Sequence, residues 1–208
     1  MTYIFINPVV DSMYIKKELD ELLLRNGYTR VAVKEDWHKI VKEKYNKALK
    51  LTGKTILDRR CPLAIDTITE YISDNDTFIP EIDPILIHCG IEIANMEDLR
   101  GHQKIITTPC ESLASYGNSK KLKDTTFISW KEFIKHLNKS EDVKVKKLDS
   151  SPIPPGYFNN LDAKISSLSG KENIISYFKN NLHKENDLVE MLYCSNGCNN
   201  GDGVLINE

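Results

Sequence analysis

The stretch TILDRRCPLAIDTI, residues 55–68, contains one complete step from a strand to a helix. Thr55 to Leu57 is short and β-branched, which is typical of a strand. A loop at Cys61 follows, and a helix is predicted to begin at Pro62, because proline suits the first helical turn. The stretch therefore predicts a strand–loop–helix unit with a cysteine in its loop.

The same alternation continues on both sides of this unit. Further strands are predicted at residues 2–6, 29–33, 104–107, 125–128 and 188–193, and helices at 11–24, 35–50, 83–96, 129–137 and 172–182. Such alternation predicts an α/β fold with mostly parallel strands flanked by helices. Charged and then proline-rich residues at 139–156 predict a connector. We expect a single domain over residues 1–208, built from two small lobes near 1–100 and 101–208.

Composition excludes several classes of protein. The 208 residues carry 28 basic and 30 acidic side chains and a formal charge of −2, which gives no case for a nucleic-acid partner. No run approaches the ~18 apolar residues of a membrane span, and the first residues do not resemble a signal peptide. We therefore expect a soluble, cytoplasmic protein without a membrane partner. Five cysteines, an odd number, also argue against a disulfide framework.

Four of the cysteines are predicted to lie near the ends of strands. Cys61, Cys110 and Cys194 each follow a predicted strand, and Cys198 lies in the same loop as Cys194. In open α/β sheets, ligands bind at the carboxyl edge of the strands. Four thiolates at one site are typical of zinc or of an iron–sulfur cluster. Buried apolar cysteines and a thiol redox role remain open on spacing alone. Cys89 belongs to a predicted helix and is left out of the site.

Three stretches resemble, in order, the signature motifs of the iron–iron hydrogenase catalytic domain, the domain that carries the H-cluster. Arg60-Cys61-Pro62 resembles the first motif, and Thr108-Pro109-Cys110 resembles the second. Residues 190–203, EMLYCSNGCNNGDG, resemble the third, in which a glutamate precedes a Cys-x3-Cys pair by four residues. Outside the motifs, the likeness extends to residues 5–8, 26–31, 83–85 and 124–137.

The resemblance implies that Cys61, Cys110, Cys194 and Cys198 bind a 4Fe–4S cluster between the two α/β lobes. In the family, the cysteine matching Cys198 also bridges to a two-iron subsite where hydrogen is made or split. No ferredoxin-like cluster domain precedes the motifs here, so the resemblance implies a separate electron donor or acceptor such as a ferredoxin.

The departures from the family pattern concern the reaction rather than the cluster. Arg60 stands where many catalytic members carry a proton-passing cysteine, and Leu113 stands where a lysine holds a cyanide ligand. Thr108 and Leu192 replace methionines. Only 83 residues separate Cys110 from Cys194, with no counterpart of the glycine-rich segment that walls the two-iron pocket. No catalytic residue is therefore assigned. The chain is expected to be a hydrogenase-like 4Fe–4S protein of electron transfer or redox sensing. An active hydrogenase and a metal-free interaction module remain the alternatives.

Overall fold

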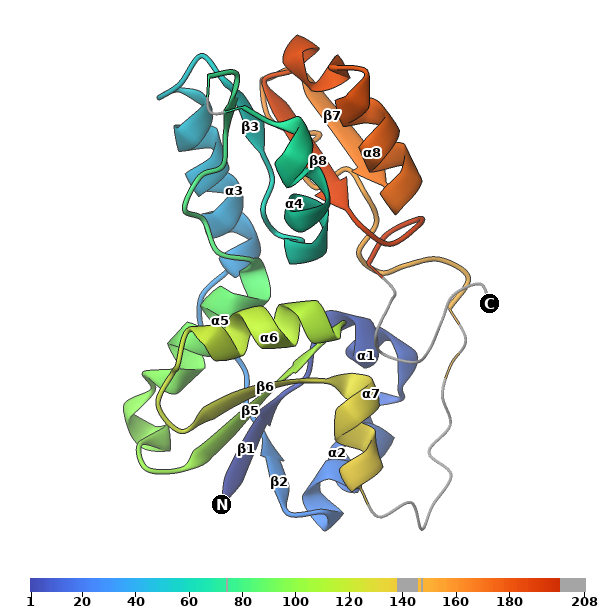
Figure 1. Ribbon diagram of the computed structural model, residues 1–208. Helices are drawn as coiled ribbons and strands as arrows, with labels where there is room; N and C mark the ends of the chain where they lie inside the picture. Colours follow the sequence, from blue (N-terminus) through green and yellow to red (C-terminus); the bar gives the residue numbers. More distant parts are fainter. Residues whose placement is uncertain (74, 138–145, 147, 199–208) are drawn as a thin grey trace. The chain divides into compact units, whose positions relative to one another are not determined.

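The computed structural model describes residues 1–73, 75–137, 146 and 148–198 (Figure 1). Contacts divide the chain into two units. Unit 1 combines Met1–Glu35 with the described part of Leu86–Pro152, and unit 2 combines Asp36–Ile85 with Ile153–Cys198. Each unit thus contains two separate segments of the chain, which differs from the predicted lobes 1–100 and 101–208. Most of the connector predicted at 139–156 lies outside the described residues.

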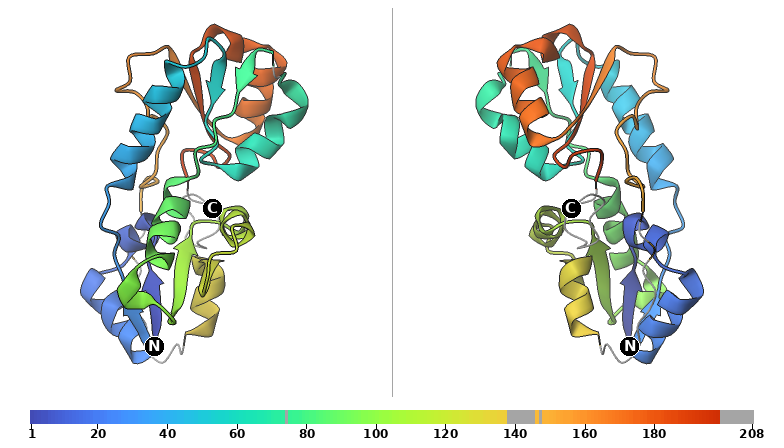
Figure 2. Two further views of the ribbon diagram at one scale, coloured as in Figure 1. Left: turned by 90° about the vertical axis from the view of Figure 1, so that its left-hand side faces the viewer. Right: turned by 90° about the vertical axis from the view of Figure 1, so that its right-hand side faces the viewer.

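Unit 1 is built on a four-stranded parallel sheet with helices on both faces (Figure 2). The strand order is β2-β1-β5-β6, with β1 at Thr2–Phe5, β2 at Tyr28–Arg30, β5 at Gln103–Thr108 and β6 at Thr125–Ser129. Side chains of β1 alternate between two cores, as a two-residue period requires. Ile4 packs in one core, and Tyr3 and Phe5 pack against the other.

Two sets of helices contribute to these two cores of unit 1. The first core is shared by α1 (Pro8–Met13), α2 (Lys16–Arg25) and α7 (Trp130–Phe133). The second is shared by α5 (Ile85–Ala94) and α6 (Glu111–Ser119). Apolar residues of the sheet are thus buried on both faces, as expected for parallel strands.

Unit 2 has a second four-stranded parallel sheet, in the order β4-β3-β8-β7. The strands are β3 at Thr55–Leu57, β4 at Thr77–Phe78, β7 at Ile165–Ser169 and β8 at Leu188–Leu192. Helix α3 (Trp37–Leu49) packs in one core, while α4 (Pro62–Ile68) and α8 (Lys171–Lys179) pack in the other. Short 3-10 helices lie at Thr69–Tyr71, Glu97–Leu99, Ile134–His136 and Leu182–Glu185.

The predicted α/β fold with two lobes and mostly parallel strands is confirmed, and every strand pair of both sheets is parallel. The helix predicted at 11–24 is wrong in detail, because Tyr14 is extended and separates α1 from α2. Asn7 rather than Asp11 caps the first of these helices, accepting a hydrogen bond from the Val10 amide at 3.1 Å. No helix of the described residues combines the length and apolar character needed to cross a bilayer.

Candidate functional site

Cys61 and Cys194 follow neighbouring strands of the same sheet. Strand β3 ends at Leu57 and β8 ends at Leu192, so both cysteines lie just beyond a strand end, as predicted. The two strands are parallel and pair Leu57 with Val189. Their carboxyl ends therefore meet at one edge of the unit 2 sheet. This is the edge at which α/β proteins bind ligands.

A tight turn joins Cys194 to Cys198 in the same unit. Asn196 and Gly197 have φ values of 59° and 116°, in the left-handed region that glycine adopts at little cost. The Asn196 amide donates a hydrogen bond to Ser169 Oγ at 3.1 Å. The Cys198 amide donates to the Ile153 carbonyl at 2.9 Å. These two hydrogen bonds attach the turn to β7 and to the segment that begins at residue 153.

The Cys61 side chain is partly accessible, and its surroundings favour the neutral thiol. Burial raises the pKa of Cys61, and the backbone amides of Tyr193 and Ala64 partly offset this effect. The neighbouring Cys194 and Asp58 raise the pKa further. A metal ion that takes the place of the proton would favour the thiolate form of Cys61.

Cys110 occupies a comparable place in unit 1. It follows β5, which lies beside β1, and the helices after these two strands lie in different cores. The position is a topological switch point, a common place for a ligand. The Cys110 sulfur caps α6 and accepts a hydrogen bond from the Leu113 amide at 3.4 Å.

The predicted ligands are thus divided between the units: Cys61, Cys194 and Cys198 lie in unit 2, and Cys110 lies in unit 1. None of these four cysteines forms a disulfide bond. Across the described ranges, no three Cys, His, Asp or Glu side chains are grouped closely enough to hold a metal ion. Cys89 is buried in α5, where burial and Glu92 raise its pKa to about 12.

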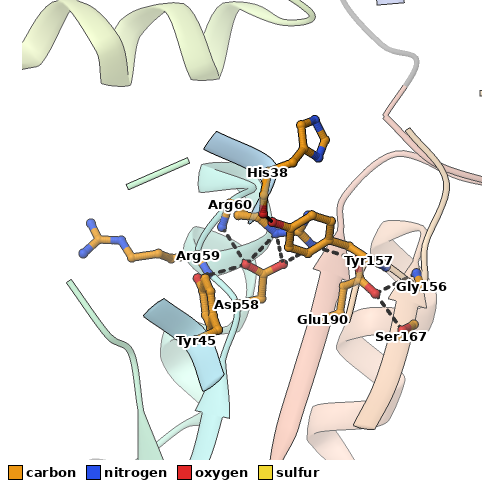
Figure 3. Close-up of polar contacts among 9 residues, drawn as sticks. All are labelled: His38, Tyr45, Asp58, Arg59, Arg60, Gly156, Tyr157, Ser167 and Glu190. Atoms are coloured by element: carbon orange, nitrogen blue, oxygen red, sulfur yellow. Dashed lines mark hydrogen bonds and ion pairs between the residues drawn. The ribbon is translucent and has the colours of Figure 1, made fainter. Parts of the chain in front are cut away.

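A buried ionic cluster adjoins Cys61 in unit 2 and is formed by Asp58, Arg60 and Glu190 (Figure 3). We call these three residues the Arg60 cluster. Arg60 Nη2 lies 2.8 Å from Asp58 Oδ2 and 2.7 Å from Glu190 Oε1. The side chains are 10%, 0% and 1% exposed for Arg60, Asp58 and Glu190. Burial alone lowers the pKa of Arg60, but the two carboxylates outweigh it and keep the pKa above its ordinary value.

Neutral groups and aromatic rings complete the surroundings of the Arg60 cluster. The Tyr45 hydroxyl donates to Asp58 Oδ1 at 3.0 Å, and the Ser167 hydroxyl donates to Glu190 Oε2 at 2.6 Å. The guanidinium carbon lies 4.0 Å from the ring centre of Tyr157 and 4.6 Å from that of Phe158. Buried charges are tolerated in a fold when they are paired and hydrogen-bonded in this way.

Sequence reasoning missed the role of Asp58 and treated Arg60 only as a departure from a family motif. Two signals were available in the sequence. Asp58 directly follows the apolar strand β3, and Glu190 interrupts the otherwise apolar strand β8. A charged residue within an apolar strand needs a partner of opposite charge.

No family model matches the chain, and no curated protein matches it in sequence.

Proposed function

We propose that the chain is a 4Fe–4S cluster-binding protein of the iron–iron hydrogenase family, acting in electron transfer or redox sensing. Its ligands are Cys61, Cys110, Cys194 and Cys198. The observation that carries the proposal is the place of Cys61 and Cys194, which follow adjacent parallel strands at one sheet edge. The order of the three cysteine motifs in the sequence gives independent support.

The residues of unit 2 fit such a group in their chemistry. Cys61, Cys194 and Cys198 are partly accessible and form no disulfide bond. The pKa of Cys61 is raised chiefly by burial, and backbone amides beside its sulfur favour the thiolate. Amides near ligating sulfurs are typical of iron–sulfur sites, where they tune the reduction potential. A bound cluster supplies reversible one-electron transfer.

The proposed setting follows from charge and thiol chemistry. Five cysteines that form no disulfide are usual for a reducing compartment, so we place the protein in the cytoplasm. Its electrons come from a separate carrier such as a ferredoxin. The nearly balanced charge of −2 offers no support for nucleic-acid binding.

Anaerobic reconstitution with iron and sulfide tests the proposal. We expect about four irons per chain, the content of one cubane cluster with cysteine ligands. Cys61→Ala, Cys110→Ala, Cys194→Ala and Cys198→Ala should each abolish the intact cluster. Cys89→Ala is the matched control, because it removes a buried thiol outside the proposed ligand set, and it should retain full iron content. Stoichiometric zinc in protein purified without air would contradict the proposal.

A further inference from the structure

We infer that Arg60 is a positioning residue, which orders the cysteine-bearing loops of unit 2 before any metal binds. The inference deepens the proposed function and rests on it in one respect, namely that the ordered thiols serve as metal ligands. The ordering itself is a property of the metal-free chain.

The first argument is connectivity, since the Arg60 cluster joins the segments that carry three cysteines. Arg60 precedes Cys61 directly, and its backbone amide donates to Asp58 Oδ1 at 3.0 Å. Glu190 lies on β8, four residues before Cys194. One guanidinium therefore ties the loop after β3 to the strand that leads to Cys194.

The third cysteine is connected through the segment that begins at Ile153. Glu190 accepts hydrogen bonds from the amides of Gly156 at 2.7 Å and Tyr157 at 3.1 Å. The Ile153 carbonyl in the same segment accepts the Cys198 amide. Displacement of Glu190 would therefore release the backbone to which Cys198 is bonded.

The second argument is that the Arg60 cluster is complete without a ligand. Asp58 Oδ1 accepts from the Tyr45 hydroxyl and the Arg60 amide, and Oδ2 accepts from Arg60 Nε at 3.0 Å. Both oxygens of Glu190 also have donors. Because each carboxylate oxygen already accepts a hydrogen bond, these groups do not require a metal ion as a partner. Their role is therefore to support the loops.

Charge makes the guanidinium indispensable to this arrangement. Two buried carboxylates face one largely buried cation, so loss of Arg60 leaves two like charges in a site with little exposure to solvent. Removing one partner from a buried ion pair destabilises a protein far more than replacing the whole pair with apolar residues. A lysine keeps the charge but lacks the planar fork that serves both carboxylates together.

The experiment measures the alkylation rate of each cysteine in metal-free protein, using iodoacetamide and peptide mass spectrometry. In the wild-type chain Cys61 should react slowly. In Arg60→Met we expect Cys61 and Cys194 to react roughly tenfold faster or more, because the loops open locally. Arg60→Lys should give a smaller increase. Cys110, in the other unit, is the internal control and should keep its rate.

Lys184→Met is the matched control variant, since it removes the cation of an exposed ion pair with Asp76 in the same unit. It should leave every rate unchanged. If Arg60→Met unfolds the chain, Cys89 and Cys110 accelerate too, and Arg60→Lys then decides. Unchanged protection of Cys61 and Cys194 in the folded variant overturns the inference, as does an equal increase in Lys184→Met. Failure of the wild-type protein to take up iron would instead count against the proposed function.

Discussion

Arg60 and Glu190 are separated by 130 residues of sequence, yet Arg60 Nη2 lies 2.7 Å from Glu190 Oε1 in the core of unit 2. The contact joins the loop after β3 to β8, the strand beside it in the sheet. The stability of unit 2 should consequently depend on the charges of both residues.

Glu190→Gln should destabilise unit 2 by about 3 kcal/mol, because it leaves the buried Arg60 with one carboxylate fewer and exchanges two oxygen acceptors for one. Urea unfolding followed by fluorine NMR of 5-fluorotryptophan measures this, since Trp37 lies in unit 2 and Trp130 in unit 1. Asp76→Asn, which breaks an exposed ion pair of unit 2, is the control and should scarcely move the midpoint. A loss no larger than that of the control would show that Glu190 is not needed to compensate Arg60.

Gly117→Ala should destabilise unit 1 by about 1–2 kcal/mol through overpacking. A Cβ atom at Gly117 would lie 2.4 Å from Cγ of Phe127, and one at Gly90 would meet the same ring at 2.4 Å. Because glycines flank the ring at both points, it has little room to withdraw. The fluorine signal of Trp130 in urea reports the change.

The control is Gly53→Ala in unit 2, read from the fluorine signal of Trp37, since a Cβ at Gly53 meets no atom within 4 Å. The double variant Gly117→Ala with Phe127→Leu should recover part of the lost stability, because the smaller side chain leaves space for the methyl group. Equal stability of Gly117→Ala and the wild-type chain would contradict the close approach of α6 to β6.

Unit 2 should lose stability as the pH falls below about 6.5. Burial lowers the pKa of His183 from its ordinary value of 6.5, and Lys184 lowers it further. A histidine with a lowered pKa in the folded state binds protons better when unfolded, so acid favours unfolding and the effect vanishes above that pH. His38 in the same unit contributes with the same sign, since burial also lowers its pKa.

His183→Phe should reduce this pH dependence, because a phenyl ring can keep the stacking on Phe178, whose ring centre lies 4.7 Å away. Urea midpoints of unit 2 between pH 5 and 8 provide the measurement. His136→Gln, at an exposed histidine of unit 1, should leave the curve unchanged. An identical acid loss in His183→Phe would exclude this histidine as the cause.

Local patterns in the sequence predicted the main elements of the fold but not their grouping. The strand at Thr55 to Leu57 and the helix from Pro62 are predictable, because β-branched residues and an N-terminal proline act locally. Strand β7, with the sequence ISSLS, was missed, since its serines weaken the apolar alternation. Its stability depends on pairing with β8, a long-range contact that a local pattern does not encode.

The candidate site was predictable to the same extent. The predicted strand positions correctly placed Cys61 and Cys194 beside strand ends, and that these ends bind a ligand stays a prediction. The Arg60 cluster was not predictable, since it depends on which strands become neighbours. Only after β3 and β8 are paired do Asp58 and Glu190 come within reach of one guanidinium.

The last prediction is that the protein does not turn over hydrogen at a useful rate. Heterolytic chemistry at iron needs a proton donor whose pKa lies near the working pH. On the proposed family assignment, Arg60 takes the place of that donor, and Asp58 and Glu190 keep its pKa above the ordinary value even though burial alone would lower it. Leu113 offers no side-chain donor to a cyanide ligand, and its backbone amide is directed at Cys110 Sγ.

The experiment supplies reconstituted protein with a synthetic two-iron subsite and records infrared spectra and hydrogen evolution from reduced viologen. We expect neither stable carbonyl and cyanide bands nor sustained hydrogen, because orientation of such ligands depends on surrounding donors. An active iron–iron hydrogenase treated identically is the positive control. Glu111, whose carboxylate accepts a hydrogen bond from Ser129, is the nearest acidic group in sequence to Cys110. Hydrogen production that persists in the wild-type chain and disappears in Glu111→Gln would overturn the prediction and identify a replacement donor.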